Sequence, residues 1–250
     1  MLTQLYTSAS GLIAGERKVE LISNNLANVN TPAYRADRPL FSSYFTDAVA
    51  AASGGNTPAS PQSVALAGRW YEEAQGALRS TGNPFDLALR GDGWFRVQTQ
   101  AGERLTRGGS FAVDAEGRLT TAEGAAVLDD RGMEIILAPD EALSGEFSVN
   151  PEGMISVDGG QVATLGLVKA DLRNLEREGA GLWRPIGPVV EMEPGSTEVA
   201  QGYIEQSAVE ATSELVNLIS AQRLFEMHQK LVDVGFNNVA RKAVELGRPR

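Results

Sequence analysis

The sequence contains one histidine and no cysteine, so few side chains could carry catalytic chemistry. A Ser-His-Asp triad would have to use His228. This residue lies among polar residues in a stretch with helical character, from Gln222 to Lys230. We therefore interpret it as a solvated or contact-making histidine rather than a catalytic one. The lack of cysteine excludes disulfides, thiolate metal sites and cysteine nucleophiles.

Paired carboxylates are the second group that could do chemistry. Asp129-Asp130 and Asp140-Glu141 could supply the acid and base of a secreted carbohydrate-active enzyme. Both pairs lie beside turn residues, where acidic side chains are usually solvated, and no other catalytic grouping accompanies them. We therefore predict a protein that is not an enzyme and that binds no cofactor and no metal ion, with the carbohydrate-active enzyme as the alternative.

Composition argues against several classes of partner. The 250 residues carry 32 acidic and 22 basic side chains, a net charge of −10. A nucleic-acid-binding protein needs a basic surface, and anionic membranes attract basic segments. Nucleic acid and membrane surfaces are therefore not expected partners, and no small-molecule substrate is indicated. Glu16, Arg17 and Lys18 interrupt the N-terminal apolar residues, so we expect neither a cleavable secretory signal nor a membrane-spanning helix.

The N-terminal region has the periodicity of a long helix. Four apolar residues recur every seven positions, which is the spacing of a coiled-coil seam. They are Leu5, Leu12, Val19 and Leu26. The helix should end between Asn28 and Pro32, because asparagine is a weak helix former and the residue before a proline avoids the α region.

The C-terminal region repeats this pattern over a longer span and predicts a helix from about Ala211 to Leu246. Its seam residues are Leu218, Phe225, Val232, Val239 and Leu246. An apolar stripe of this length is not stable in water, so the two seams should pair with each other or with neighbouring molecules. A helical hairpin that caps the central domain is the alternative.

Between the helices the composition changes twice. Thr46 to Gln62 is rich in small residues, glycine and proline, as in a linker or an extended arm. Short alternating apolar segments separated by glycine turns follow, which favour antiparallel strands. We therefore predict an α+β fold, with a central antiparallel β-domain over 81–206 and an arm over 35–80. Long terminal helices over 1–34 and 207–250 should pair as a coiled-coil-like helical domain.

One turn pattern occurs twice in the predicted β-domain. The segment 113–119 has the sequence VDAEGRL, and 149–155 has the similar sequence VNPEGMI. An Asp or Asn starts each turn, and a glycine follows where positive φ is needed. Both segments therefore predict a hairpin of the same type.

Three blocks of the sequence resemble the flagellar rod and hook protein family. The first, from Ile22 to Arg35, has the sequence ISNNLANVNTPAYR, with Ala33 where the family usually has glycine. The second lies within 81–95 and begins TGNPFDLAL, and the third lies within 202–227 and begins GYIEQS. Because the blocks occur in order at both ends and in the middle, the resemblance covers nearly the whole chain.

The resemblance implies a structural subunit of the bacterial flagellar basal-body rod. It implies export by the flagellar type III apparatus, helical assembly with other rod subunits, and a place in the periplasmic drive shaft of motility. Gly93-Trp94 and 224–227 resemble the proximal-rod type of the family, with a distal-rod subunit as the alternative. A binding module for rod assembly, which would recognise a partner by strand addition, is a further interpretation.

A cluster of asparagines closes the predicted N-terminal helix. The carboxamides of Asn24, Asn25, Asn28 and Asn30 could hydrogen-bond to neighbouring subunits and fix their register, or they could cap the helix end. We favour the subunit contact. The predicted assembly interface therefore comprises the two seams together with Asn24, Asn25 and Asn28.

Overall fold

The computed structural model divides the chain into two compact units. It describes residues 2–45, 62–137, 146–179, 181–192 and 196–246. Unit 1 comprises Met1–Ala27, Asp37–Tyr71 and Glu210–Arg250, and unit 2 comprises Asn28–Ala36 and Glu72–Val209. The chain therefore passes between the units four times.

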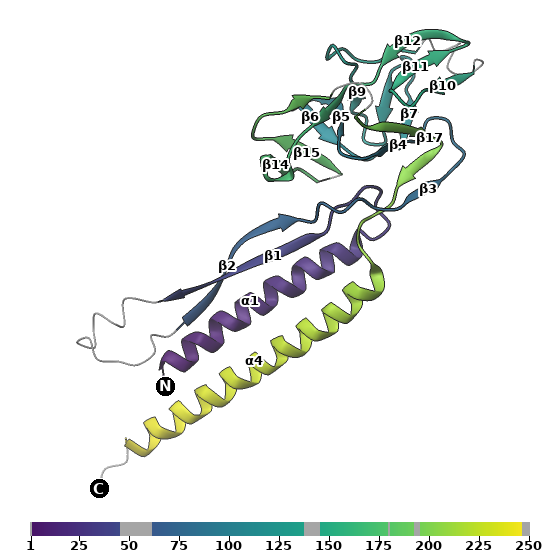
Figure 1. Ribbon diagram of the computed structural model, residues 1–250. Coiled ribbons are helices and arrows are strands. Elements are labelled where there is room, and N and C mark those ends of the chain that lie inside the picture. The colour runs from purple at the N-terminus through teal and green to yellow at the C-terminus, as the bar shows by residue number, and fades with distance from the viewer. Residues whose placement is uncertain (1, 46–61, 138–145, 180, 193–195, 247–250) are drawn as a thin grey trace. The chain divides into compact units, whose positions relative to one another are not determined.

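Unit 1 combines two helices with a β-hairpin (Figure 1). Its elements are α1 (Leu2–Ala27), β1 (Asp37–Phe45), β2 (Gln62–Tyr71) and α4 (Ala211–Leu246). The strands pair antiparallel from Asp37 opposite Tyr71 to Phe45 opposite Gln62, with an irregularity after Leu40. The bounds of α4 agree with the predicted helix. The two strands occupy part of the range predicted as an arm, and residues 46–61 of its low-complexity stretch lie outside the described residues.

The helices α1 and α4 run antiparallel and pack through glycines. The ring of Phe225 lies over Gly15, and the imidazole of His228 lies over Gly11. A Cβ atom at Gly11 would be 2.8 Å from Cε1 of His228, so only glycine allows this approach without a shift of the ring. Bulky side chains of α4 therefore fit over small residues of α1.

The predicted fold class is wrong in its helical domain. Among the described residues there are two α-helices and one turn of 3₁₀-helix, η1 (Leu172–Asn174), and most other elements are antiparallel strands. The helices do not form a coiled-coil domain of their own, because they share unit 1 with the β1–β2 hairpin. Glycines lie on α1 where it meets α4, whereas a coiled coil needs large knobs there. The seven-residue spacing of apolar residues predicted one seam, but the buried residues of α1 cover a wider arc, because they include Gly15, Leu21, Ile22 and Asn25.

Unit 2 is built from short antiparallel strands (Figure 1). One sheet has the strand order β14–β15–β6–β5–β9–β8–β7, with β13 pairing to β5 and β16 pairing to β13. A three-stranded sheet, β10–β11–β12, and two pairs, β17–β4 and β18–β3, complete the unit. The strand bounds are β3 (Leu78–Ser80), β4 (Leu87–Arg90), β5 (Trp94–Thr99), β6 (Gly102–Thr106), β7 (Phe111–Val113), β8 (Leu119–Thr121), β9 (Ala126–Val127), β10 (Phe147–Val149), β11 (Met154–Val157), β12 (Gly160–Thr164), β13 (Leu167–Lys169), β14 (Leu175–Arg177), β15 (Leu182–Pro185), β16 (Val190–Glu191), β17 (Glu198–Gln201) and β18 (Tyr203–Glu205).

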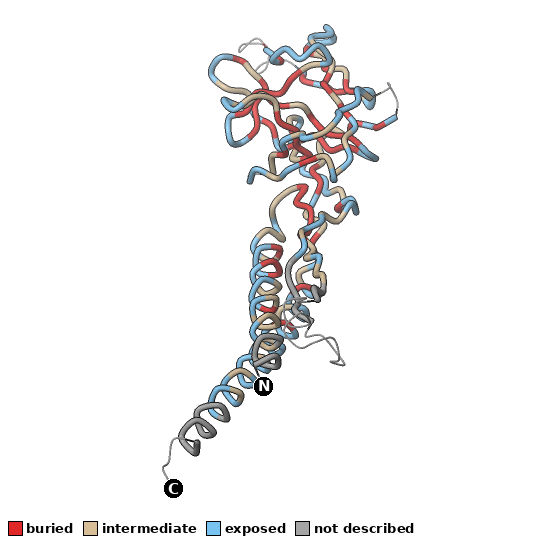
Figure 2. Tube along the Cα trace, turned by 90° about the vertical axis from the view of Figure 1, so that its left-hand side faces the viewer, coloured by how far each residue is buried: buried red, intermediate tan, exposed pale blue. Residues whose placement is uncertain are grey.

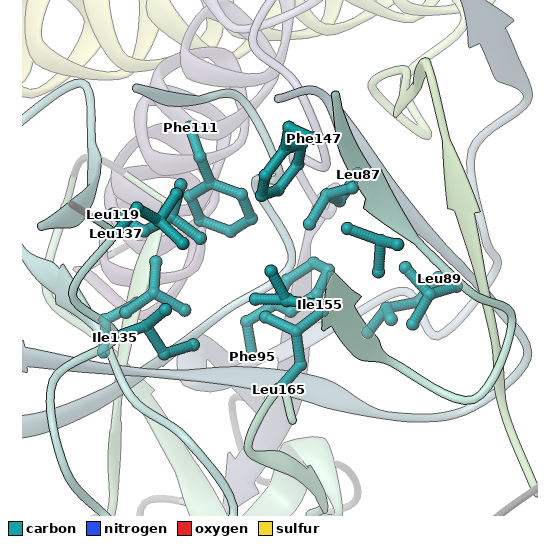
Figure 3. Packing of buried hydrophobic residues seen from close by; sticks show 14 of the residues in the cluster. Leu87, Leu89, Phe95, Phe111, Leu119, Ile135, Leu137, Phe147, Ile155 and Leu165 are labelled. Carbon is teal, nitrogen blue, oxygen red and sulfur yellow. The ribbon is translucent and has the colours of Figure 1, made fainter. Parts of the chain in front are cut away.

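The hydrophobic core of unit 2 is formed by the inward faces of these strands (Figure 3). Phe95 packs edge-on against Phe111 with ring centroids 5.2 Å apart, and Leu87, Leu89 and Ile155 lie in the same buried cluster. Buried residues are concentrated in unit 2, whereas most of the described part of α4 is exposed (Figure 2).

Both hairpins predicted from the repeated turn pattern are confirmed, and the structure contains a third. Val113 pairs with Leu119, and Val149 pairs with Ile155. Asp129 uses the same geometry, because its Oδ1 accepts hydrogen bonds from the backbone N–H groups of Arg131 at 2.9 Å and Met133 at 2.7 Å. A carboxylate that was considered for acid–base chemistry therefore forms a turn. Its companion pair, 140–141, lies outside the described residues.

Candidate assembly interface and junction clamp

The structure places the predicted seam residues on the two helices of unit 1. Leu12, Val19 and Leu26 of α1 are partly buried, as are Leu218, Phe225 and Val232 of α4. The remaining three belong to the same helices, but their side chains lie outside the described part; they are Leu5, Val239 and Leu246. The contacts of Phe225 with Gly15 show that part of the C-terminal seam packs within the chain.

The three predicted asparagines differ in their surroundings. Asn25 is fully buried, and its carboxamide bonds to the backbone of Asp37 in both directions. Asn28 accepts a hydrogen bond from the hydroxyl of Thr31 at 3.1 Å, as in a turn that follows a helix end. Asn24 is exposed on α1. Asn25 therefore joins α1 to β1 rather than capping the helix, and only the bond of Asn28 fits the alternative of a turn at the helix end. The predicted subunit contact of the three residues stays a prediction.

A partly buried ion pair connects β1 to the first turn of α4. Nη1 of Arg38 lies 2.6 Å from Oε1 of Glu214, whose side chain is almost fully buried. A carboxylate in the first turn also interacts favourably with the positive end of the helix dipole. Within unit 1, Arg38 therefore connects β1 to the N-terminal end of α4, and Asn25 connects β1 to the C-terminal end of α1.

The second half of α4 exposes four large apolar side chains in a row, which we call the outer stripe. Their spacing of three, four and three residues places them on one side of the helix. They are Leu224, Met227, Leu231 and Val234, each between 38% and 58% exposed. None of the four belongs to the predicted seam, although their spacing is visible in the sequence.

Three segments of unit 2 that adjoin the unit boundaries lie side by side. The N–H of Ala33 donates to the carbonyl of Glu205 at 2.9 Å, and the N–H of Ala208 donates to that of Tyr34 at 3.0 Å. The N–H of Gln206 donates to the carbonyl of Ala77 at 2.9 Å. The segments 28–36, 72–78 and 204–209 are therefore joined by main-chain hydrogen bonds.

A buried ion cluster, which we call the junction clamp, joins the same segments. Oε1 of Glu205 lies 3.0 Å from Nη2 of Arg35, and Oε2 lies 3.2 Å from Nη1 of Arg107. The N–H of Gly76 donates to Oε1 at 3.2 Å. All three charged side chains are at most 5% exposed. Burial lowers the pKa of Arg35 and that of Arg107 below the usual value, and the charge of Glu205 opposes this shift in both.

Aromatic rings extend the clamp into the sheet of unit 2. The guanidinium of Arg177 lies 4.4 Å from the ring centre of Tyr34 and 4.8 Å from that of Trp183. Trp183 meets Trp94 edge-on at 5.5 Å, and Arg107 lies 5.8 Å from the ring of Trp94. Such cation–π contacts are stronger when they are shielded from water. The clamp and these rings form one connected network that joins the segments to the sheet of unit 2.

Two structural features are absent from the residues that the structure describes. None of the helices in that part of the chain is long and apolar enough to cross a membrane. Within the same residues, no group of three or more His, Asp or Glu side chains is placed to bind a metal ion.

Three family profiles match the chain and define its class. Residues 5–35 match a profile described as flagella basal body rod protein, and residues 88–157 match the flagellar hook protein FlgE/F/G D1 domain. Residues 200–238 match the C-terminal region of the flagellar basal body rod FlgEFG proteins. The matches fall on the three blocks that carry the resemblance in the sequence, or overlap them. These descriptions define the class as the flagellar rod and hook proteins.

Relatives of similar length identify the family. The flagellar basal-body rod protein FlgF of Caulobacter vibrioides is 31% identical over 96% of each chain, and that of Mesorhizobium japonicum is 34% identical over 90% of each. The flagellar basal-body rod protein FlgG of Bacillus subtilis is 30% identical over 99% of this chain and all of the relative. The chain belongs to the flagellar basal-body rod protein family, as predicted, and membership places it in the rod of the basal body.

Proposed function

We propose that the chain is a structural subunit of the proximal rod, which assembles helically with other rod subunits into the drive shaft and catalyses no reaction. Relatives named FlgF support the proximal position, and relatives named FlgG keep the distal rod as the alternative. In this proposal, the function of the chain is to make contacts with other subunits that withstand torque. The surfaces that make those contacts are therefore the functional site.

The outer stripe of α4 is the observation that carries this proposal. Four exposed apolar side chains in a heptad-like row are unfavourable in water, where burial would contribute about 25 cal/mol per Å² of apolar surface. Contiguous apolar patches of this kind mark interaction sites on soluble proteins. The stripe thus has the chemistry of a helix face that is buried against another subunit.

The predicted seam and asparagines belong to the same proposal. The partly buried seam residues Leu12, Val19 and Leu218 have surface left to bury in an assembly, and exposed Asn24 has carboxamide chemistry suited to a neighbour. Contacts that use different patches on each partner can propagate as a helix rather than close.

The surroundings of three side chains support a role without catalysis. The single histidine is packed on Gly11, and Asp129 is engaged in its hairpin turn. Glu205 is buried between Arg35 and Arg107, where it stabilises the junction clamp. Each of these side chains therefore has a structural task.

We also propose export by the flagellar type III apparatus as an unfolded chain that is not embedded in the membrane. The absence of cysteine from the sequence means that refolding after transport needs no disulfide chemistry. Unit 1 contains segments from both ends of the chain, so it folds only when the whole chain has emerged. This order suits a subunit that assembles at its destination.

Electron microscopy of basal bodies from a deletion strain tests the proposal. The rod should be absent or truncated at the proximal level, and the native chain should restore it. A chain with Met227→Asp and Leu231→Asp should keep the circular dichroism of the native protein but build no rod, since charges cannot be buried in an apolar contact. Gln229→Asp, an exposed position on the same helix, is the matched control and should restore motility. Complete rods in the deletion strain would overturn the proposal.

A further inference from the structure

The side of α1 that faces away from α4 has a regular pattern of its own. Every residue in a series spaced by four, three, four, three and four positions is exposed. The series, which we call the outer face of α1, consists of Ala9, Ile13, Glu16, Glu20, Ser23 and Ala27. Gly11 and Gly15, which contact α4, lie on the opposite side of the helix. The outer face is therefore a narrow surface of mostly small residues around one large apolar side chain, Ile13. Glu20 forms an exposed ion pair with the neighbouring Arg17 at 2.7 Å, so Glu16 is the carboxylate that a second helix could use.

The outer stripe of α4 has complementary chemistry. Arg223 and Lys230 are exposed one heptad apart along one edge of the stripe. Large apolar side chains with a basic edge would fit a surface of small residues that carries the carboxylate of Glu16. The same fit occurs inside the chain, where Phe225 and His228 of α4 lie over Gly15 and Gly11 of α1.

We propose that the outer stripe of α4 in one copy packs on the outer face of α1 in a second copy. This inference rests on the proposed function, because it names the partner of the stripe. Within the chain, Gly11 meets His228 and Gly15 meets Phe225 in an antiparallel arrangement. The same register between copies brings Ile13 to Met227, Ala9 to Leu231 and Glu16 to Arg223.

The charges decide between this partner and a second α4. In a two-fold antiparallel pair of outer stripes, the basic edges carrying Arg223 and Lys230 would meet each other, and like charges in contact are destabilising. The pair would also close as a dimer, because both partners use the same patch. The contact between the outer stripe of α4 and the outer face of α1 instead uses two different patches. Each added copy therefore leaves one outer stripe available to bind the next copy.

Cysteine crosslinking tests the contact, since the native chain contains no cysteine that could interfere. Basal bodies would be isolated from a deletion strain that carries Ile13→Cys with Met227→Cys and then oxidised. We expect a ladder of covalent multimers, because the two residues lie on faces that do not meet within one chain. Ile13→Cys with Glu226→Cys is the matched control: Glu226 is exposed beside Met227 but points about 100° away on an ideal helix. This control should give no ladder.

Charge reversal supplies a second, independent readout. Glu16→Lys alone and Arg223→Glu alone should each reduce rod assembly, and the double variant should restore it. Motile cells without a ladder, or equal ladders in the matched control, would overturn the contact while leaving the proposed function intact. Crosslinked dimers from Met227→Cys alone would show that two α4 stripes meet and would also overturn it. Complete rods in the deletion strain would remove the proposed function itself.

Discussion

Asn25 and the backbone of Asp37 form a hydrogen-bonded pair in both directions. Nδ2 of Asn25 donates to the carbonyl of Asp37 at 2.9 Å, and the N–H of Asp37 donates to Oδ1 of Asn25 at 2.8 Å. Both groups are buried. The carboxamide thereby imitates a strand partner for the first residue of β1, and it joins α1 to the hairpin within unit 1.

Replacing Asn25 with Ala should destabilise unit 1. The change leaves the N–H and carbonyl of Asp37 buried without their partners, at a cost of about 1–3 kcal/mol for each unsatisfied group. Hydrogen exchange of the Asp37 amide would report the loss directly. Ser23→Ala, an exposed change on the same helix, should alter the free energy of unfolding by less than about 0.5 kcal/mol. Equal protection of the Asp37 amide in both variants would contradict this account.

Replacing Ala33 with Gly should stabilise unit 2. Ala33 has a φ angle of 55°, a left-handed conformation that disfavours a residue with a Cβ atom by about 1–2 kcal/mol. Glycine removes this strain but adds about 0.4–1 kcal/mol of chain entropy in the unfolded state, so the net gain should be about 0.5 kcal/mol.

Denaturant unfolding measures the effect of the Ala33 change. Ala36→Gly is the control, because Ala36 is fully buried and is not among the described residues with positive φ. It should lower the midpoint, whereas Ala33→Gly should raise it. A lower midpoint for both variants would show that the methyl group of Ala33 contributes more than its strain.

Local patterns in the sequence predicted several elements correctly. The seven-residue apolar repeat predicted the bounds of α4, and the Asx–glycine pattern predicted the hairpins at Asp114 and Asn150. Each of these depends on residues that are close in sequence, so their chemistry is visible there. The three sequence blocks that resemble the rod and hook family also identified the family, because they lie at both ends and in the middle of the chain.

Long-range pairing was not predictable in the same way. Nothing near Glu205 in the sequence indicates that Arg35 and Arg107 meet its two carboxylate oxygens. The glycines Gly11 and Gly15 were not recognised as a helix contact, because a missing side chain leaves no apolar signal. The coiled-coil-like domain was wrong for this reason: the seven-residue period of apolar residues was visible, and the hairpin that shares unit 1 with the helices was not.

Replacing Glu205 with Gln should weaken unit 2 severely. The amide keeps the shape but removes the carboxylate that lies between two buried guanidinium groups, and breaking such a pair costs about 3–5 kcal/mol. Fluorescence of Trp94 and Trp183, which lie in the same network, would follow unfolding in denaturant. Glu198→Gln removes an exposed carboxylate 4.0 Å from Arg90 and should have almost no effect. Similar midpoints for the two variants would show that the clamp adds little to stability.

The hairpin at Asp114 should respond to acid in a way that its sister hairpin does not. Loss of hydration alone would raise the pKa of Asp114, but hydrogen bonds and charge from Arg118 outweigh it and lower the pKa below its ordinary 3.8. A carboxyl with a depressed pKa in the folded state stabilises the fold above the unfolded-state value, and this contribution is lost as the pH falls below 3.8.

Replacing Asp114 with Asn separates the charge of this side chain from its turn geometry. The sister hairpin has Asn150, whose Oδ1 accepts from the N–H groups of Glu152 at 3.2 Å and Met154 at 2.8 Å. The introduced carboxamide should accept from the N–H groups of Glu116 and Arg118 in the same way, so the hairpin should form normally at neutral pH. In the native protein, protection of the Arg118 amide against hydrogen exchange, corrected for the intrinsic pH dependence, should decrease when the pH is lowered below 3.8. In Asp114→Asn this protection should stay constant. Parallel loss of protection in both proteins would mean that another group controls the acid response of the hairpin.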